Sequence, residues 1–273
     1  MKKKLTAVAL IVCMLAIMLV GASLAYFTDE DQVENTFTVG NVKIDLYETK
    51  DGKKIDEGID FKDAIVPGRE FVKDPTIDVE DGSQDAYVFL DMTINKYKSL
   101  FPVMAQDAVA DAEIEYTAEQ LEECMVEGKF STKAFLTQMK ETPAVFRSIV
   151  DKWFVGIEHT DWEVCGFFYN VAEDDTKAAG NYMTIRFAYI GEDTLSADDE
   201  PVTFMKKFMM PASVTQEMVE NTETGVNAFN DAKIGFKMNF TAYAIQAAEI
   251  ADTEAAFAAL FGTELGEYWT ALN

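Results

Sequence analysis

The residues that could perform acid–base or metal chemistry are unevenly represented in this sequence. It contains one histidine, His159, in the segment GIEHTDWEV, against 48 aspartates and glutamates. A metallopeptidase helix of the His-Glu-x-x-His type needs two histidines one turn apart, and the chain cannot supply the second. It also lacks a Gly-x-Ser-x-Gly motif and a glycine-rich phosphate loop. The sequence therefore predicts no catalytic residue, no metal site and no cofactor.

Carboxylates gather in three segments that could bind calcium through hard oxygen ligands. These segments are Asp78–Asp85, Glu173–Asp175 and Glu192–Glu200. None of them closely fits the Asp-x-Asp-x-Asp-Gly pattern of a calcium-binding loop. Short acidic runs between predicted strands are typical of solvated turns, so we expect loops here rather than a specific calcium site.

The N-terminus has the layout of a secretory signal peptide. Lys2 to Lys4 form a basic region, Leu5 to Val20 form an apolar region, and the small residues Ser23 and Ala25 occupy positions −3 and −1 of the predicted cut. We predict cleavage after Ala25, which makes Tyr26 the first mature residue. An uncleaved anchor is the alternative, because the stretch up to the cut is about long enough to cross a ~30 Å hydrocarbon core.

Removal of the leader leaves an acidic chain. The leader carries three lysines and no acid, so the formal charge changes from −25 to −25 − 3 = −28. Nucleic acid is an improbable partner for such a chain, since phosphate binding requires clustered lysine and arginine. The charge also makes self-association depend on salt. Cys124 and Cys165 remain after cleavage, and whether they form a disulfide stays open.

The pattern of apolar residues predicts a mainly β fold. Val42–Leu46 and Ile234–Ala242 alternate apolar with polar residues, as half-buried strands do. Asp85–Ile94, Val164–Tyr169 and Tyr182–Ile190 are apolar on both faces, which suits central strands. Further strand signals occur near 66–79 and 201–209. Because no regular strand–helix alternation is present, we expect an antiparallel β-sandwich.

Two segments interrupt the β pattern. Residues 105–152 have helical spacing with breaks near Gly128 and Pro143, and we interpret them as a helical insertion between strands. Near the C-terminus, Asp252 and Thr253 cap a short amphipathic helix that is expected to place Ala255, Ala256, Ala259 and Leu260 on one face. The mature chain, residues 26–273, is thus predicted to form a single domain.

A resemblance appears in the residues that follow the predicted cut. The segment AYFTDEDQVENTFTVGNVKIDLYE, Ala25 to Glu48, resembles the leader junction and first strand of the TasA/camelysin family, which forms extracellular fibres in Gram-positive biofilms. Val66-Pro-Gly68 with the strand at Lys73-Asp74, and FTAYAIQA at Phe240–Ala247, are further matches. The similarity covers about fifty residues closely and does not extend to the 105–152 insertion.

The resemblance implies a jelly-roll β-sandwich, export, and processing by a SipW-type signal peptidase. It also implies assembly into fibres, in which each subunit lends an N-terminal strand to the next. The partner is another copy of the same chain, in a homopolymer, or another matrix fibre protein. The alternating residues Phe27, Val33, Phe37 and Val39 are the candidate assembly strand. The same alternation also fits a strand in the chain's own sheet. An extracellular metal-dependent hydrolase of the camelysin type is the alternative function.

Overall fold

The computed structural model describes most of the chain beyond the predicted leader. The described residues are 37–39, 41–50, 53–55, 66–95, 97–157, 160–170, 182–215, 218, 237–263 and 270–272. The chain divides into two compact units, Met1–Gln32 and Val33–Asn273, and all described residues belong to the second. Several predicted functional residues lie outside the described ranges: Ser23, Ala25, Tyr26, Phe27, Val33 and His159.

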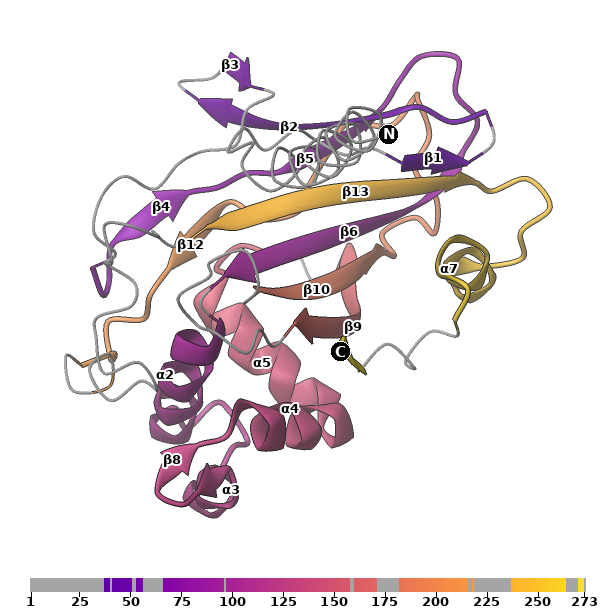
Figure 1. Ribbon diagram of the computed structural model, residues 1–273. Helices are drawn as coiled ribbons and strands as arrows, with labels where there is room; N and C mark the ends of the chain where they lie inside the picture. The colour runs from indigo at the N-terminus through magenta and orange to yellow at the C-terminus, as the bar shows by residue number, and fades with distance from the viewer. Residues whose placement is uncertain are drawn as a thin grey trace, which may run out of the picture. The chain divides into compact units, whose positions relative to one another are not determined.

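A six-stranded sheet forms the centre of the fold (Figure 1). Its four inner strands are antiparallel, whereas the short strands at its two edges run parallel to their neighbours. In spatial order the strands are β1 (Phe37–Val39), β13 (Met238–Gln246), β6 (Ala86–Asn95), β10 (Tyr182–Tyr189), β9 (Trp162–Asn170) and β14 (Thr270–Leu272).

The remaining strands form smaller antiparallel sheets. A four-stranded sheet has the order β11 (Val202–Thr203), β5 (Thr76–Val79), β2 (Ile44–Lys50) and β3 (Lys53–Ile55). Two further pairs are β12 (Lys207–Met209) with β4 (Glu70–Val72), and β7 (Met125–Val126) with β8 (Lys129–Phe130). Strands therefore occur in every region where the alternation predicted them and the structure describes the chain. The expected strand at 234–242 is β13, whose described part begins at Met238.

One apolar cluster joins the two larger sheets. Strand β2 contributes the buried residues Ile44 and Leu46 to this cluster. Strand β6 contributes Leu90 and Met92. Ile77 of β5 completes the contact between the sheets. These residues are two positions apart on each strand, and side chains at that spacing point to the same face. One face of each sheet is therefore buried in the common core. The mainly β prediction is thereby confirmed as strands in antiparallel sheets with few helices.

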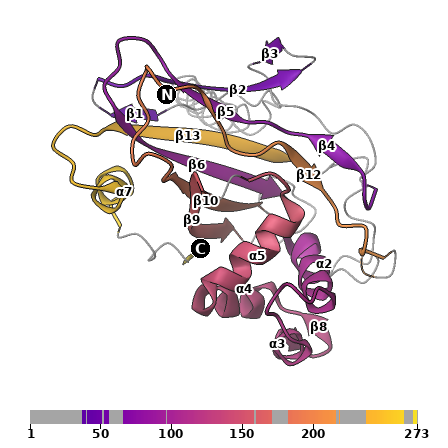
Figure 2. The same cartoon turned by 180° about the vertical axis from the view of Figure 1, so that it is seen from behind.

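The helices between β6 and β9 group together on one side of the large sheet (Figure 2). The structure corrects the start of the predicted insertion, because its first helix begins at Tyr97 instead of near residue 105. Pro102 lies inside this helix, yet Leu100, Phe101 and Val103 around it are fully buried, and their burial outweighs the poor helix propensity of proline. The helices are α2 (Tyr97–Ala110), α3 (Ala118–Glu123), α4 (Thr132–Glu141) and α5 (Pro143–Trp153).

The ends of these helices follow the chemistry of their residues. Thr117 forms a capping box with Gln120 before α3, and the Ser131 hydroxyl accepts from the amide of Ala134 before α4. Gly128, at φ 77°, occupies the β7–β8 turn, and Pro143 is at the first position of α5. The predicted breaks near Gly128 and Pro143 are therefore confirmed.

A short helix near the C-terminus, α7 (Thr253–Phe261), covers the other face of the large sheet. The Asp252 carboxylate accepts from the amide of Ala255, and Gly262 ends the helix in the left-handed conformation at φ 70°. The predicted cap is confirmed, and of the predicted face Ala256 and Leu260 are confirmed whereas Ala255 and Ala259 are wrong. Ala255 and Ala259 are exposed, because the sheet lies against Ala256, Phe257, Leu260 and Phe261.

Cys124 and Cys165 are both free and buried. Cys124 lies in the core cluster beside α3, and Cys165 lies on β9 in the smaller cluster under α7. Their positions in separate clusters resolve the alternative that the sequence left open. No disulfide joins them.

Candidate assembly edge and two buried ion pairs

The predicted assembly strand ends in β1, at one edge of the large sheet. Phe37 and Val39 are opposite Tyr243 and Ile245 of β13, in a parallel pair of three residues. Phe27 and Val33, the other two members of the predicted strand, lie outside the described residues. The structure thus places the C-terminal half of the predicted strand in the sheet of its own chain.

The chain becomes firmly attached directly after β1. The Asn41 amide donates to the side-chain oxygen of Gln246 at 3.1 Å, and the Asn41 carbonyl accepts from the Gln84 amide at 3.1 Å. Two residues further on, the Lys43 amide donates to the Ser83 hydroxyl at 3.0 Å. Val42 between them is buried in the core. Asn41, the first described residue after β1, is therefore bound to the rest of the molecule through both its amide and its carbonyl.

Strand β13, the partner of β1, is packed on both faces. Ala242 and Ala244 face the core between the sheets, whereas Ile245 and Tyr243 face the cluster under α7. Such a strand is held in place independently of β1. The position of β13 therefore depends little on its three residue pairs with β1.

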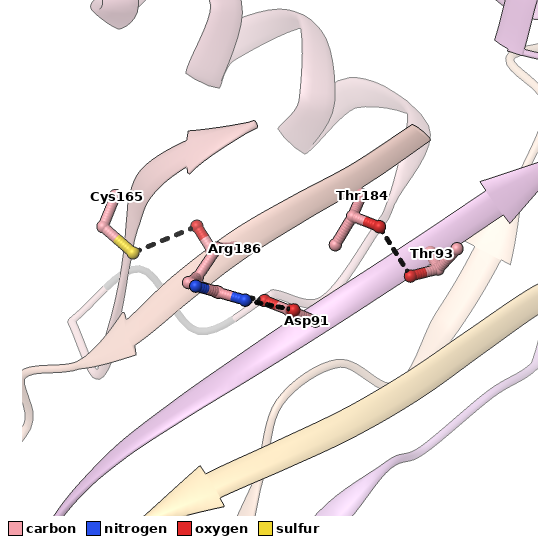
Figure 3. A network of polar contacts seen from close by, with 5 residues as sticks. All are labelled: Asp91, Thr93, Cys165, Thr184 and Arg186. Atoms are coloured by element: carbon pink, nitrogen blue, oxygen red, sulfur yellow. Dashed lines mark hydrogen bonds and ion pairs between the residues drawn. The ribbon is translucent and has the colours of Figure 1, made fainter. Parts of the chain in front are cut away.

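A buried ion pair lies on the α7 face of the sheet, between neighbouring positions of β6 and β10. Figure 3 shows the guanidinium of Arg186 against the carboxylate of Asp91, with Nε–Oδ1 at 2.5 Å and Nη2–Oδ2 at 2.6 Å. The Cys165 thiol donates to the Arg186 carbonyl at 3.4 Å, and the hydroxyls of Thr93 and Thr184 pair at 2.8 Å on the next rung. The two-point geometry is the strongest form of an arginine–carboxylate contact.

Aromatic rings enclose this ion pair. The Arg186 guanidinium carbon lies 3.5 Å from the ring centre of Phe261 in α7, and 5.1 Å from that of Tyr243. Burial raises the pKa of Asp91, and the hydrogen bonds from Arg186 act in the opposite direction. Burial also raises the pKa of the Cys165 thiol, which therefore stays protonated and unreactive. We interpret this cluster as the attachment of α7 to the sheet.

A second buried ion pair joins the strands of the smaller sheets. The Lys73 ammonium lies 2.5 Å from Oε1 of Glu48, with side-chain exposures of 2% and 9%. Among the described residues Oε2 of Glu48 has no hydrogen-bond partner. Burial lowers the pKa of Lys73, while the adjacent Glu48 carboxylate opposes that shift. The ring of Phe240 is 5.4 Å from the ammonium.

Sequence reasoning did not identify either ion pair. Asp91 and Arg186 each stand inside a run of apolar strand residues, and a lone charge in such a run signals a buried partner. The sequence cannot show which charge meets which, because that follows from the register that sets Arg186 opposite Asp91.

Within the described ranges, no group of three or more histidine, cysteine, aspartate or glutamate side chains has the arrangement of a metal site. His159 is not in those ranges. The helices of the described part are all too short or too polar to cross a membrane. No protein-family model, curated protein or solved structure matches this chain.

Proposed function

We propose that this protein is a secreted structural protein, a subunit or accessory of extracellular fibres in a biofilm matrix or on a cell surface. In this proposal the sheets form a jelly-roll β-sandwich, and the protein is not an enzyme. Subunits join when the N-terminal strand of one pairs with the sheet of another. The observation that carries the proposal is the position of β1, a strand of three residues at one edge of the large sheet.

Strand lending fits the energetics of this edge. A pair of three residues contributes few hydrogen bonds, so little pairing is lost when β1 changes its partner. An exposed sheet edge, in contrast, offers a row of unpaired backbone groups to any strand of suitable length. In this proposal the N-terminal segment exchanges its partner while the inner strands of the large sheet stay paired.

The proposal includes the steps before assembly. A SipW-type signal peptidase cuts after Ala25, and Tyr26 becomes the end of the segment that is lent. The acids Asp29, Glu30 and Asp31 keep this segment soluble until it pairs. The partner is a second copy of the chain or another matrix fibre protein, and no cofactor or nucleic acid takes part.

Light scattering and electron microscopy of two purified chains test the proposal. The mature chain from Tyr26 is expected to form fibres, whereas a chain that starts at Asn41 is expected to stay monomeric with an unchanged circular dichroism spectrum. A Phe27→Ser, Val33→Ser chain should grow slowly, because it loses apolar side chains of the assembly strand. The matched change Thr28→Ser should leave growth unchanged. Fibre growth by the Asn41 chain at the rate of the mature chain would refute strand lending.

A further inference from the structure

Glu48 and Lys73 occupy positions that the alternation of their segments assigns to the core. On β2 the buried side chains recur at every second residue, at Ile44, Leu46 and Glu48. Lys73 directly follows β4 and lies two residues after the buried Phe71. Side chains at this spacing share one face of an extended segment, so both charged groups are directed into the interior. A charge at such a position is unfavourable, because it loses its hydration.

Neighbouring residues hold these two side chains together. The amide and the hydroxyl of Thr49 both donate to the carboxylate of Asp74, the amide at 2.9 Å. The Lys73 amide donates to the carbonyl of Lys206 at 3.3 Å. The residues that follow Glu48 and Lys73 in the chain are therefore bound to each other, which fixes the two buried side chains side by side. Groups that are well oriented in this way react as if at effective concentrations of about 10⁵–10⁸ M.

The surroundings of the pair make the lysine a better nucleophile. Nζ of Lys73 lies 2.5 Å from Oε1 of Glu48, and the ring of Phe240 is 5.4 Å from the same nitrogen. Burial lowers the pKa of Lys73, and the carboxylates of Glu48 and Asp74 act in the opposite direction. A larger share of this amine is therefore neutral than at an exposed lysine. Desolvated, neutral lysine amines attack carbonyl carbons.

We propose that Lys73 and Glu48 condense to an amide, which joins β2 covalently to the segment after β4. A proton first moves from Nζ to the carboxylate within the pair. The Nζ lone pair then attacks Cδ of Glu48 and forms the C–N bond. One carboxyl oxygen leaves as water, with one proton from the amine and one from the acid. The step needs no oxidant, reductant or other reactant, and it takes place within one chain, so it does not rest on the proposed function.

An amide suits this position better than an ion pair does. Two buried charges lose their hydration, and their mutual attraction often fails to offset this loss. The amide carries no formal charge, so its formation removes the unfavourable term. The bond also closes a loop of 73 − 48 = 25 residues and restricts the unfolded chain, as a disulfide does.

Mass spectrometry of the purified chain tests the inference directly. We expect the intact chain to be lighter, by one water molecule, than the sequence between its observed termini. Trypsin cuts after an unmodified Lys73 and releases peptides 70–73 and 74–96, whereas an amide at Lys73 prevents this cut. The expected product is one branched peptide, in which residues 44–50 are joined through Glu48 to Lys73 of residues 70–96. An intact mass equal to that of the sequence, with complete release of peptides 70–73 and 74–96, would overturn the inference.

The exposed pair of Lys207 and Glu70 is a control within the same chain. Its Nζ–Oε1 distance of 2.7 Å is close to that of the buried pair, but its side chains are 40% and 51% exposed. We expect no peptide linked through Lys207. A linkage there in the same yield would overturn the inference, because amide formation would then not depend on the buried site.

A double variant tests the assignment of the two residues. Lys73→Met with Glu48→Leu removes both reacting groups and leaves neither charge buried alone. We expect this chain to have the full mass of its sequence. The loss of one water in the double variant, as in the unaltered chain, would place the reaction at other residues and overturn the inference.

Discussion

The guanidinium of Arg186 and the carboxylate of Asp91 illustrate how single charges are tolerated inside this β fold. Both side chains lie under α7, and the two hydrogen bonds between them satisfy groups that burial would otherwise penalise. The ring of Phe261 over the guanidinium adds a cation–π contact. Removal of one partner leaves the other charge buried and unpaired, which costs more than the pair itself contributes.

At the residue scale we predict that Arg186→Met lowers the free energy of unfolding by about 3–5 kcal/mol, because Asp91 is left without its counter-ion. The double change Arg186→Met with Asp91→Leu should recover much of this loss. Lys207→Met is the control, since Lys207 and Glu70 form an exposed pair whose removal should cost under about 1 kcal/mol. Equilibrium urea unfolding measures all three, and similar losses in Arg186→Met and Lys207→Met would contradict the prediction.

Asp151 on α5 should make stability depend on pH. Burial raises its pKa from 3.8 to about 6, against the opposing effect of Arg147. The folded state therefore binds more protons than the unfolded state between these values, so stability falls as pH rises through this range. We expect Asp151→Asn to raise the melting temperature at pH 7 and to have less effect below pH 4. An equal effect at both pH values would show that Asp151 titrates normally.

His159 is the remaining residue of chemical interest. The proposal that this protein is not an enzyme predicts that any proteolysis in purified samples will be insensitive to chelators and unchanged by His159→Ala. Catalytic zinc sites use three protein ligands, commonly with two or more histidines, and this chain has one. Chelator-sensitive cleavage of casein that disappears in the His159→Ala chain would favour the hydrolase instead.

At the element scale, α7 depends on its cap as well as on its buried face. Asp252→Ala removes the acceptor for the Ala255 amide and should destabilise the protein by about 1 kcal/mol, whereas Asp252→Asn retains an acceptor and should cost less. Thermal unfolding followed by circular dichroism makes the comparison. A smaller effect for Asp252→Ala than for Asp252→Asn would mean that the cap does not contribute.

The edge strands of the large sheet are held by fewer contacts than its central strands. β6 and β10 are buried on both faces and paired on both sides, so their positions are strongly determined. β1 and β14 are short and pair on one side each. In the proposed function, the element that changes its partner is β1, one of these short edge strands, as local stability predicts.

At the scale of the whole molecule, charge would oppose the proposed assembly. The chain without residues 1–25 has a formal charge of −25 − 3 = −28, and in the proposal subunits must approach closely before strands can pair. We predict that fibre growth accelerates between about 10 mM and 150 mM salt, where the screening length decreases from about 30 Å to about 8 Å. Light scattering across a sodium chloride series measures the rate. Faster growth at the lowest salt would show that repulsion between subunits is not the barrier.

Local pattern alone determined several features of this protein. Strand positions follow from period-two alternation, the cap at Asp252 from its side chain, and the breaks at Gly128 and Pro143 from their backbone preferences. Each of these depends on a few neighbouring residues, which is why sequence reasoning finds them. The start of α2 was missed because Pro102 argues against a helix locally, and only burial of its neighbours reverses that preference.

Contacts between distant residues required the tertiary structure. Three features depend on register and packing between segments far apart in the chain. They are the ion pair of Asp91 with Arg186, the ion pair of Lys73 with Glu48, and the choice of the buried face of α7. The same holds for the two sheet edges: alternation shows that residues 37–39 can form a strand, but the strand order alone places β1 and β14 at opposite edges of the large sheet. A sequence specifies which residues prefer to be buried or extended. The neighbour that each one meets is decided by the fold as a whole, because burial and backbone pairing are satisfied jointly.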